Sequence, residues 1–158
     1  PEETNGHIDD VACFVRPGEV ACIWTEDPQH PFYKEAQAAY ETLSKATDAK
    51  GRKLKVHKLC LTKEPVLLKG ADTIDAVEGT IPREDGEVCI ASYMNFTIVN
   101  GGVIVPQYDD ANDKLALKQI AAMFPERKAV GVSTKEVVYG GGNIHCITQQ
   151  QPAPVVNR

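Results

Sequence analysis

The spacing of apolar residues predicts one order of secondary-structure elements that occurs twice along the chain. Apolar runs at 11–15 and 20–24 flank Pro17-Gly18, which is the pattern of two strands joined by a tight turn. A one-sided apolar stripe at 32–46 then predicts a helix, and alternating apolar positions at 54–61 predict a third strand. The first unit is therefore expected to run strand, strand, helix, strand.

A second unit with the same order is expected over roughly residues 88–132. A run rich in β-forming residues at 89–99 leads through a glycine-rich hairpin turn into a strand at 103–105. An apolar stripe at 117–124 predicts a helix, and residues 129–132 predict the closing strand. The fold class is thus predicted to be α/β, built from repeated ββαβ modules.

Two consecutive modules, roughly 11–61 and 88–132, are expected to complete each other's hydrophobic core. Two unrelated α/β segments in an ordinary sandwich are the alternative. The connection at 62–87 is long and carries several proline and glycine residues, which is typical of a functional loop or an insertion. A lid, an interface and a passive excursion all stay open for it.

Length and charge limit the classes of function. At 158 residues the chain fits one domain of ordinary size. The formal net charge of -5 argues against a nucleic-acid interface, which needs clustered Lys and Arg. No apolar run approaches the roughly 20 residues of a membrane span, so no membrane partner is expected.

The five cysteines are odd in number and form no C-x-x-C pair, which fits a reducing cytoplasm better than a disulfide framework. Four of them lie in apolar strand-like runs and are predicted to be small buried side chains: Cys13, Cys22, Cys60 and Cys89.

Cys146 differs from the other cysteines in its surroundings. Three glycines at 140–142 precede it, and a polar run at 148–151 follows it. Tandem glycines let the backbone approach a ligand closely, and a thiol behind such a loop is placed for chemistry rather than for packing. A fifth buried structural thiol is the alternative, but the flanking residues favour a nucleophile.

His7 and Asp9 are the candidate partners near the other end of the chain. In an extended segment residues two apart face the same way, so these side chains would share one face while Ile8 and Asp10 point to the other. Such a pair can act as an acid/base with a substrate clamp, or can bind a metal. A loop histidine with a capping aspartate is the alternative. The spacing does not match standard metal-ligand patterns, so no metal is expected.

The remaining histidines are weaker candidates. His145 adjoins Cys146, but neighbours in an extended chain point to opposite faces, so His145 is predicted to pack or to bond backbone. His30 and His57 lie in a predicted turn and strand with no catalytic residue types around them. His7 is therefore the expected acid/base for Cys146.

The acidic residues near His7 bear on the substrate. Glu2, Glu3 and Asp9 add negative charge there, which would attract a cation, although a solvated acidic terminus also accounts for them. The two ends of the chain together predict a cysteine-dependent hydrolase whose substrate is a cation.

Four stretches carry a resemblance to a known family: Glu3 to Asp9, Ala91 to Phe96, Val105 to Tyr108 and Gly140 to Pro152. They closely resemble agmatine deiminase (agmatine iminohydrolase), and the resemblance runs over essentially the whole chain. Agmatine deiminases belong to the guanidine-modifying superfamily, the penteins, whose fold is five ββαβ modules around a pseudo-fivefold axis.

The resemblance implies that residues 1–158 are the C-terminal part of one pentein catalytic domain. This part would hold about two modules and a portion of a third, with the catalytic cysteine segment at 140–152. The chain starts at Pro1 without Met, which agrees with a part of a longer polypeptide. The missing N-terminal part would then supply a second guanidinium-binding carboxylate and the acidic partner of His7, and the segment alone would be inactive.

The resemblance also implies a mechanism that needs no metal or organic cofactor. Cys146 would attack the guanidinium carbon of agmatine as a thiolate and form a covalent thiouronium intermediate. His7 would protonate the departing ammonia and then activate water. Asp9 would hold the guanidinium plane through paired hydrogen bonds. The products would be N-carbamoylputrescine and ammonia.

Three further residues are expected to bind substrate. Glu3 would meet the amine at the far end of agmatine, and Gly141 and Gly142 would shape the pocket wall. Two alternatives stay open: an arginine-type guanidine deiminase, which should need basic residues for a substrate carboxylate, and a non-catalytic pentein binding module. The retained Cys146, His7 and Asp9 favour the enzyme. A homo-oligomer is compatible with the sequence.

Overall fold

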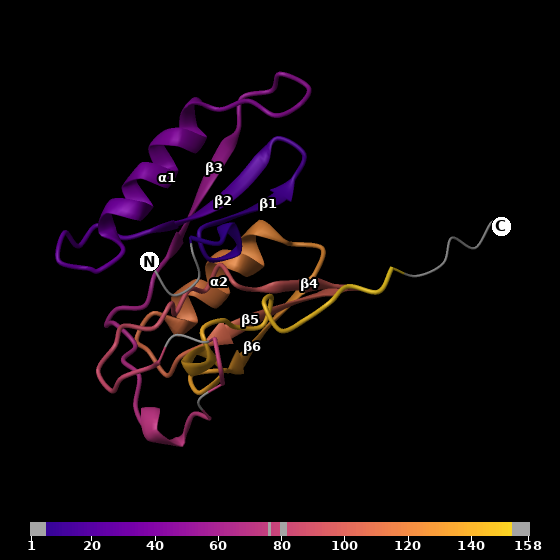
Figure 1. The fold of residues 1–158 in the computed structure, drawn as a ribbon. Helices are drawn as coiled ribbons and strands as arrows, with labels where there is room; N and C mark the ends of the chain where they lie inside the picture. Colours follow the sequence, from indigo (N-terminus) through magenta and orange to yellow (C-terminus); the bar gives the residue numbers. More distant parts are fainter. Residues whose placement is uncertain (1–5, 76, 80–81, 153–158) are drawn as a thin grey trace.

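The computed structural model of the chain describes residues 6–75, 77–79 and 82–152 and contains two units with the same order of elements (Figure 1). The first unit consists of β1 (Ala12–Arg16), β2 (Glu19–Trp24), α1 (Tyr33–Lys45) and β3 (Lys55–Cys60). The second consists of β4 (Thr97–Val99), β5 (Gly102–Gln107), α2 (Asp113–Met123) and β6 (Lys128–Ser133).

Each unit forms one three-stranded sheet in which the second strand along the chain is the central one, in the orders β1-β2-β3 and β4-β5-β6. The first two strands of each sheet pair antiparallel, and the last two pair parallel across the intervening helix. Gly18 and Gly101 occupy the two hairpin turns with positive φ, a backbone conformation that glycine adopts without steric cost. The predicted ββαβ repeat is therefore confirmed.

The stretch at 89–96 is not the strand that its β-forming residues predicted. Regular pairing begins only at Thr97, because Ser92 and Asn95 form a turn in which the backbone N–H of Asn95 donates to the carbonyl of Ser92 at 3.1 Å. The hydroxyl of Ser92 donates to the backbone carbonyl of Asp10 at 2.7 Å. Buried polar groups need partners, so this segment bonds to the N-terminal segment instead of to a neighbouring strand.

Three short 3₁₀ helices complete the described elements: η1 (Ile8–Asp10), η2 (Ala71–Thr73) and η3 (Val137–Gly140). The long connection between the units contains η2, and a single bridge between Leu67 and Val88 brings its ends together. No helix in the described part of the chain is long and apolar enough to cross a bilayer.

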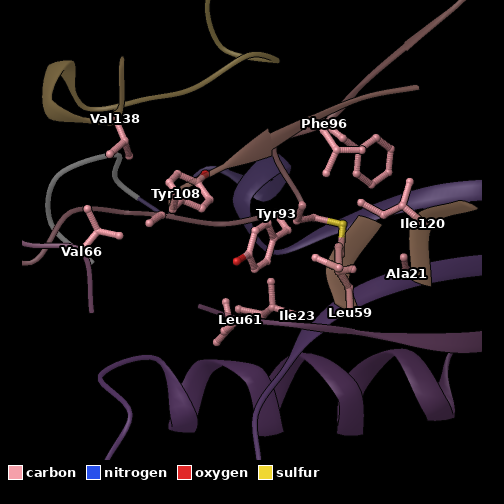
Figure 2. Packing of buried hydrophobic residues seen from close by; sticks show 14 of the residues in the cluster. Ala21, Ile23, Leu59, Leu61, Val66, Tyr93, Phe96, Tyr108, Ile120 and Val138 are labelled. Atoms are coloured by element: carbon pink, nitrogen blue, oxygen red, sulfur yellow. The ribbon is translucent and has the colours of Figure 1, made fainter. Parts of the chain in front are cut away.

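The two units share one hydrophobic core, as the repeat predicted. Helix α2 packs on β5 and β6 of its own unit and also on β3 of the first. The backbone N–H of Cys60 in β3 donates to the side-chain Oε1 of Gln119 on α2 at 3.0 Å. Figure 2 shows Leu59 and Ala21 from the first sheet beside Ile120 of α2 and Phe96, within one buried cluster.

Two tyrosines bring polar atoms into this core. Tyr93 and Tyr108 are fully buried, and their ring centroids lie 5.3 Å apart. The hydroxyl of Tyr93 donates to Asp113 at 2.6 Å, and the hydroxyl of Tyr108 donates to the carbonyl of Ser92 at 3.0 Å. The core and the irregular segment at 92–95 are thus held together by satisfied hydrogen bonds.

Replacing Leu59 by alanine is expected to destabilise the protein by about 2–5 kcal/mol, because Leu59 is 0% exposed and its removal leaves a cavity where the two units meet. The matched change of Leu115, which is 45% exposed on α2, is expected to cost less than about 0.5 kcal/mol. Chemical denaturation of the full-length protein measures both. Equal losses would contradict a core shared at Leu59.

Candidate active site

Three segments that are far apart in sequence meet at one place. They are residues 6–10 with η1, the irregular segment at 92–95, and the turn at 143–148. In Figure 1 the first is indigo and the last is yellow, and the yellow chain runs back beside β4. The hydroxyls of Thr97 in β4 and Thr148 lie 3.1 Å apart, which fixes that return.

Cys146 is exposed at this meeting point, as its glycine-rich and polar neighbours predicted. Cys22 and Cys89 are buried as expected, whereas Cys13 and Cys60 are only partly buried because they lie on β1 and β3, the two edge strands of the first sheet. The five cysteines are all free thiols in this structure.

The chain around Cys146 is a turn rather than the extended segment that was expected. The backbone N–H of Ile147 donates to the carbonyl of Asn143 at 3.1 Å, and that of Thr148 donates to the carbonyl of His145 at 3.2 Å. Consecutive side chains in such a turn do not alternate between two faces, so the geometric argument that separated His145 from Cys146 was wrong.

The glycines before Cys146 have separate structural reasons. Gly141 ends η3 with φ of 87°, in the left-handed region that other residues rarely adopt. A Cβ added to Gly142 would lie 2.9 Å from Cβ of Cys146 and 3.2 Å from its Sγ. Gly142 is therefore needed for the close approach of the backbone to the thiol side chain. Contact of Gly141 and Gly142 with a substrate stays a prediction.

Asp9 lies against Cys146, although the two are 137 positions apart. The thiol Sγ of Cys146 and Oδ2 of Asp9 are 3.2 Å apart. Asp9 belongs to η1, so the extended geometry assumed for His7 and Asp9 does not occur. Asp10, expected to face away, is buried and points into the same cluster, where its Oδ1 accepts from Asn95 at 3.0 Å.

His145 joins this cluster through its imidazole, which corrects the prediction that it would only pack or bond backbone. Its Nδ1 lies 2.8 Å from Oδ2 of Asp9. The same oxygen of Asp9 therefore meets both His145 and Cys146. One sequence signal could have indicated the contact between His145 and Asp9. The adjacent Asp9 and Asp10 offer more acceptor oxygens than His7 alone can bond, so a second donor is expected near them.

His7 lies just before η1 and is exposed. It lines a small apolar hollow together with Val11, Ile23 and Phe32 of the first unit. Within the described residues no hydrogen bond joins its side chain to Cys146, so their pairing stays a prediction. Glu3 lies outside the described residues. His30 is buried, and His57 pairs with Glu19, so neither takes part in the cluster.

Asn95 is a site residue that the sequence did not reveal. It is 0% exposed, and its amide nitrogen lies 3.2 Å from Oδ2 of Asp9 and 3.1 Å from Sγ of Cys146. Its Oδ1 accepts the backbone N–H groups of His145 at 2.9 Å and Cys146 at 3.3 Å. Two signals were available: Asn95 is a polar residue inside a run of β-forming and aromatic residues, and it lies in one of the stretches that carry the family resemblance.

The environments of Asp9 and Cys146 shift their pKa values in opposite directions. Burial raises the pKa of Asp9, but hydrogen bonds from His145 and Cys146 outweigh it, so the pKa is lowered overall. The pKa of the Cys146 thiol is raised by burial and by the charge of Asp9, against hydrogen bonds from Asn143 and Asn95 that lower it. The thiol form is favoured as long as Asp9 is the main charge beside it.

Asp9, Asp10 and Cys146 place ligand-type atoms within 4.8 Å of one another, a spacing that could also suit a metal ion. The amide nitrogen of Asn95 lies within 3.0–3.2 Å of all three side chains. An N–H donor group therefore occupies the space between the three acceptors. The cluster fits hydrogen bonding better than metal coordination.

A model of the Porphyromonas-type peptidyl-arginine deiminase family matches residues 1–152. The chain belongs to this family. A curated relative from Streptococcus mutans is 72% identical over 153 residues, which make up 97% of this chain and 42% of that protein. Agmatine deiminase of Pseudomonas aeruginosa is 48% identical over 155 residues, 97% of this chain and 42% of that protein.

The solved structure of agmatine deiminase of Enterococcus faecalis catalysing its reaction is 70% identical and matches with a TM-score of 0.92. The match covers 96% of this chain and 42% of that one. The α/β fold class with repeated modules is thereby confirmed for this member of the peptidyl-arginine deiminase family. The chain spans about two fifths of the length of these relatives, and its place at their C-terminal end stays a prediction.

Replacing Asp9 by asparagine is expected to lower the pKa of the Cys146 thiol, because it removes the negative charge that opposes the thiolate. In the full-length protein, alkylation of Cys146 by iodoacetamide should then begin at lower pH, followed by mass spectrometry of the Cys146 peptide. Asp48→Asn is the control, since Asp48 binds Arg52 outside the cluster. An unchanged or higher midpoint in Asp9→Asn would refute the electrostatic assignment.

Proposed function

We propose that this chain forms part of an agmatine deiminase, which hydrolyses agmatine to N-carbamoylputrescine and ammonia. One observation carries the proposal: an exposed thiol lies 3.2 Å from a carboxylate oxygen contributed by the other end of the chain. A nucleophile and an anion side by side suit a substrate whose electrophilic carbon carries positive charge. The named relatives support a guanidinium compound as that substrate.

Burial and the charge of Asp9 both raise the pKa of Cys146, and the contribution of Asp9 explains why the substrate should be a cation. In the free protein the charge of Asp9 opposes formation of the thiolate. A guanidinium group bound to Asp9 compensates that charge and adds a positive one close to sulfur, so the thiolate becomes more stable. The nucleophile is then activated mainly when the correct ligand is present.

The reaction proceeds in two covalent steps. The Cys146 thiolate attacks the guanidinium carbon and forms a C–S bond; the C–N bond to a terminal nitrogen then breaks, and the nitrogen leaves as ammonia with a proton from His7. His7 next removes a proton from water, which attacks the same carbon. The C–S bond breaks as the hydroxyl proton of the adduct passes to solvent, and the ureido product and the free thiolate are released.

The other substrate contacts follow the same division of roles. Asp9 holds the guanidinium group. In the free protein Oδ2 of Asp9 accepts hydrogen bonds from Cys146 and His145, and the N–H groups of the bound cation replace part of these bonds. Glu3 meets the distal amine, and the backbone at Gly141 and Gly142 forms the pocket wall. The remainder of the polypeptide supplies a second carboxylate for the guanidinium group and an acidic partner for His7.

Replacing Cys146 by alanine in the full-length protein is expected to lower kcat/KM for agmatine by at least about three orders of magnitude, because the covalent step is lost. Ureido product formation measures it, with Cys13→Ala as the control. Agmatine, free arginine and a peptidyl-arginine should be compared in the same assay, since the family is that of peptidyl-arginine deiminases. Turnover of arginine or peptidyl-arginine above agmatine would reassign the substrate.

The two histidines near η1 can be separated by a matched pair of changes. His7→Gln is expected to lower kcat by about 10²- to 10⁴-fold, as for loss of a general acid/base. His145→Gln, which removes one hydrogen bond to Asp9, is expected to lower it by about tenfold. Steady-state rates with agmatine test both. A larger loss in His145→Gln would transfer the acid/base role from His7 to His145.

A further inference from the structure

The side chain of Asn95 has two ends with different partners. Its oxygen accepts the backbone N–H groups of His145 and Cys146 at 2.9 and 3.3 Å. Its nitrogen lies 3.0–3.2 Å from Asp9, Asp10 and the sulfur of Cys146. The opposite amide orientation would place an oxygen against two carboxylates and face N–H groups with an NH₂, so only the observed one satisfies the partners.

The nitrogen of Asn95 has fewer protons than neighbours. A carboxamide NH₂ donates two hydrogen bonds, whereas three acceptor atoms surround it here. A protonated thiol donates its own proton to Asp9, at 3.2 Å, and leaves the amide protons to the two carboxylates. A thiolate, by contrast, can only accept. A cation on Asp9 then releases one amide N–H for the sulfur.

We propose that Asn95 is a positioning residue that sets the Cys146 turn through its oxygen and stabilises the thiolate through its nitrogen, most strongly when a cation occupies Asp9. This role deepens the deiminase function proposed above and rests on it. Asn95 contacts the sulfur of Cys146 at 3.1 Å, and in the proposed role it acts through Cys146 and Asp9 rather than on the substrate.

Burial makes the interaction effective. Asn95 is 0% exposed, so water does not compete for its amide groups, and hydrogen bonds to a charged acceptor are strong under such conditions. The ionisable groups that face the sulfur or lie beside it are Asp9 and Asp10 of η1, the adjacent His145, and Tyr108 beneath the turn. Tyr108 is itself held by Asn143, whose amide nitrogen donates to its hydroxyl at 3.1 Å.

The test uses the rate of Cys146 alkylation by iodoacetamide against pH in the full-length protein. Asn95→Ala removes the donor and is expected to slow alkylation at pH 7 by about tenfold. Asn95→Asp keeps the shape and the oxygen acceptor but replaces the donor by a third carboxylate, so it should be slower still. If the variants acted only by disturbing the turn, Asn95→Asp would be the milder change, because it keeps the oxygen that accepts the N–H groups of His145 and Cys146. Slower alkylation in Asn95→Asp than in Asn95→Ala therefore identifies loss of the N–H donor as the cause.

The matched control pair is Asn112→Ala and Asn112→Asp. The amide of Asn112 donates to the backbone carbonyl of Leu61 at 2.8 Å, outside the cluster, so these variants should keep the wild-type pH profile of alkylation. Melting temperatures identify any variant that does not fold. Should Asn95→Ala fail to fold, Asn95→Leu takes its place with the same expected slowing, because a neutral side chain of nearly the same size removes the amide without adding a third buried carboxyl group.

Agmatine turnover forms the second arm. Asn95→Ala is expected to lower kcat by about 10- to 100-fold with little change in KM, because thiolate formation and not substrate capture is weakened. Wild-type alkylation profiles in both Asn95 variants would overturn the role of Asn95, whatever the turnover. Shifted profiles in a protein without guanidine deiminase activity would keep that role and refute the proposed function instead.

Discussion

The approach of Cys146 to Asp9 is the interaction on which the rest of the site depends. A thiol within 3.2 Å of a carboxylate is protonated more firmly than a thiol in water, so the arrangement is unsuited to attack until the charge of Asp9 is compensated. That cost makes sense only beside a cationic ligand. The contact therefore sets the resting state of the sulfur, and under the proposed function it also sets the charge of the substrate that can activate it.

Holding this contact requires buried polar side chains, which are expensive unless every group is bonded. The segment at 92–95 meets the requirement by giving up regular strand pairing. Ser92 bonds the backbone of η1, and Asn95 bonds the turn around Cys146 as well as the two aspartates. The hydrogen bonds of these buried polar side chains outweigh the local β-propensity of the segment. The irregular stretch and the site thus have one cause.

The parts of this structure that the sequence predicted well are those fixed by local periodicity. Apolar patterns correctly placed both helices and five of the strands, namely β1, β2, β3, β5 and β6. Each pattern places one apolar face toward the core, and that face can be read from neighbouring residues alone. The contact of His145 with Asp9 could not be derived in this way. This contact depends on the turn at 143–148 and on η1. The sequence predicted extended chain at both places. Asn95 was missed because its partners are distant in sequence.

The repeat itself explains why these distant residues meet. Asp9 comes three residues before β1 begins, and Asn95 comes two residues before β4, so each lies in the segment that leads into the first strand of its unit. Cys146 lies beyond β6, in the turn that follows η3 and outside both repeated units. Units that share one core place equivalent segments side by side. Equivalent segments of the two units therefore contribute the carboxylate and the amide, and the turn at 143–148 adds the thiol beside them.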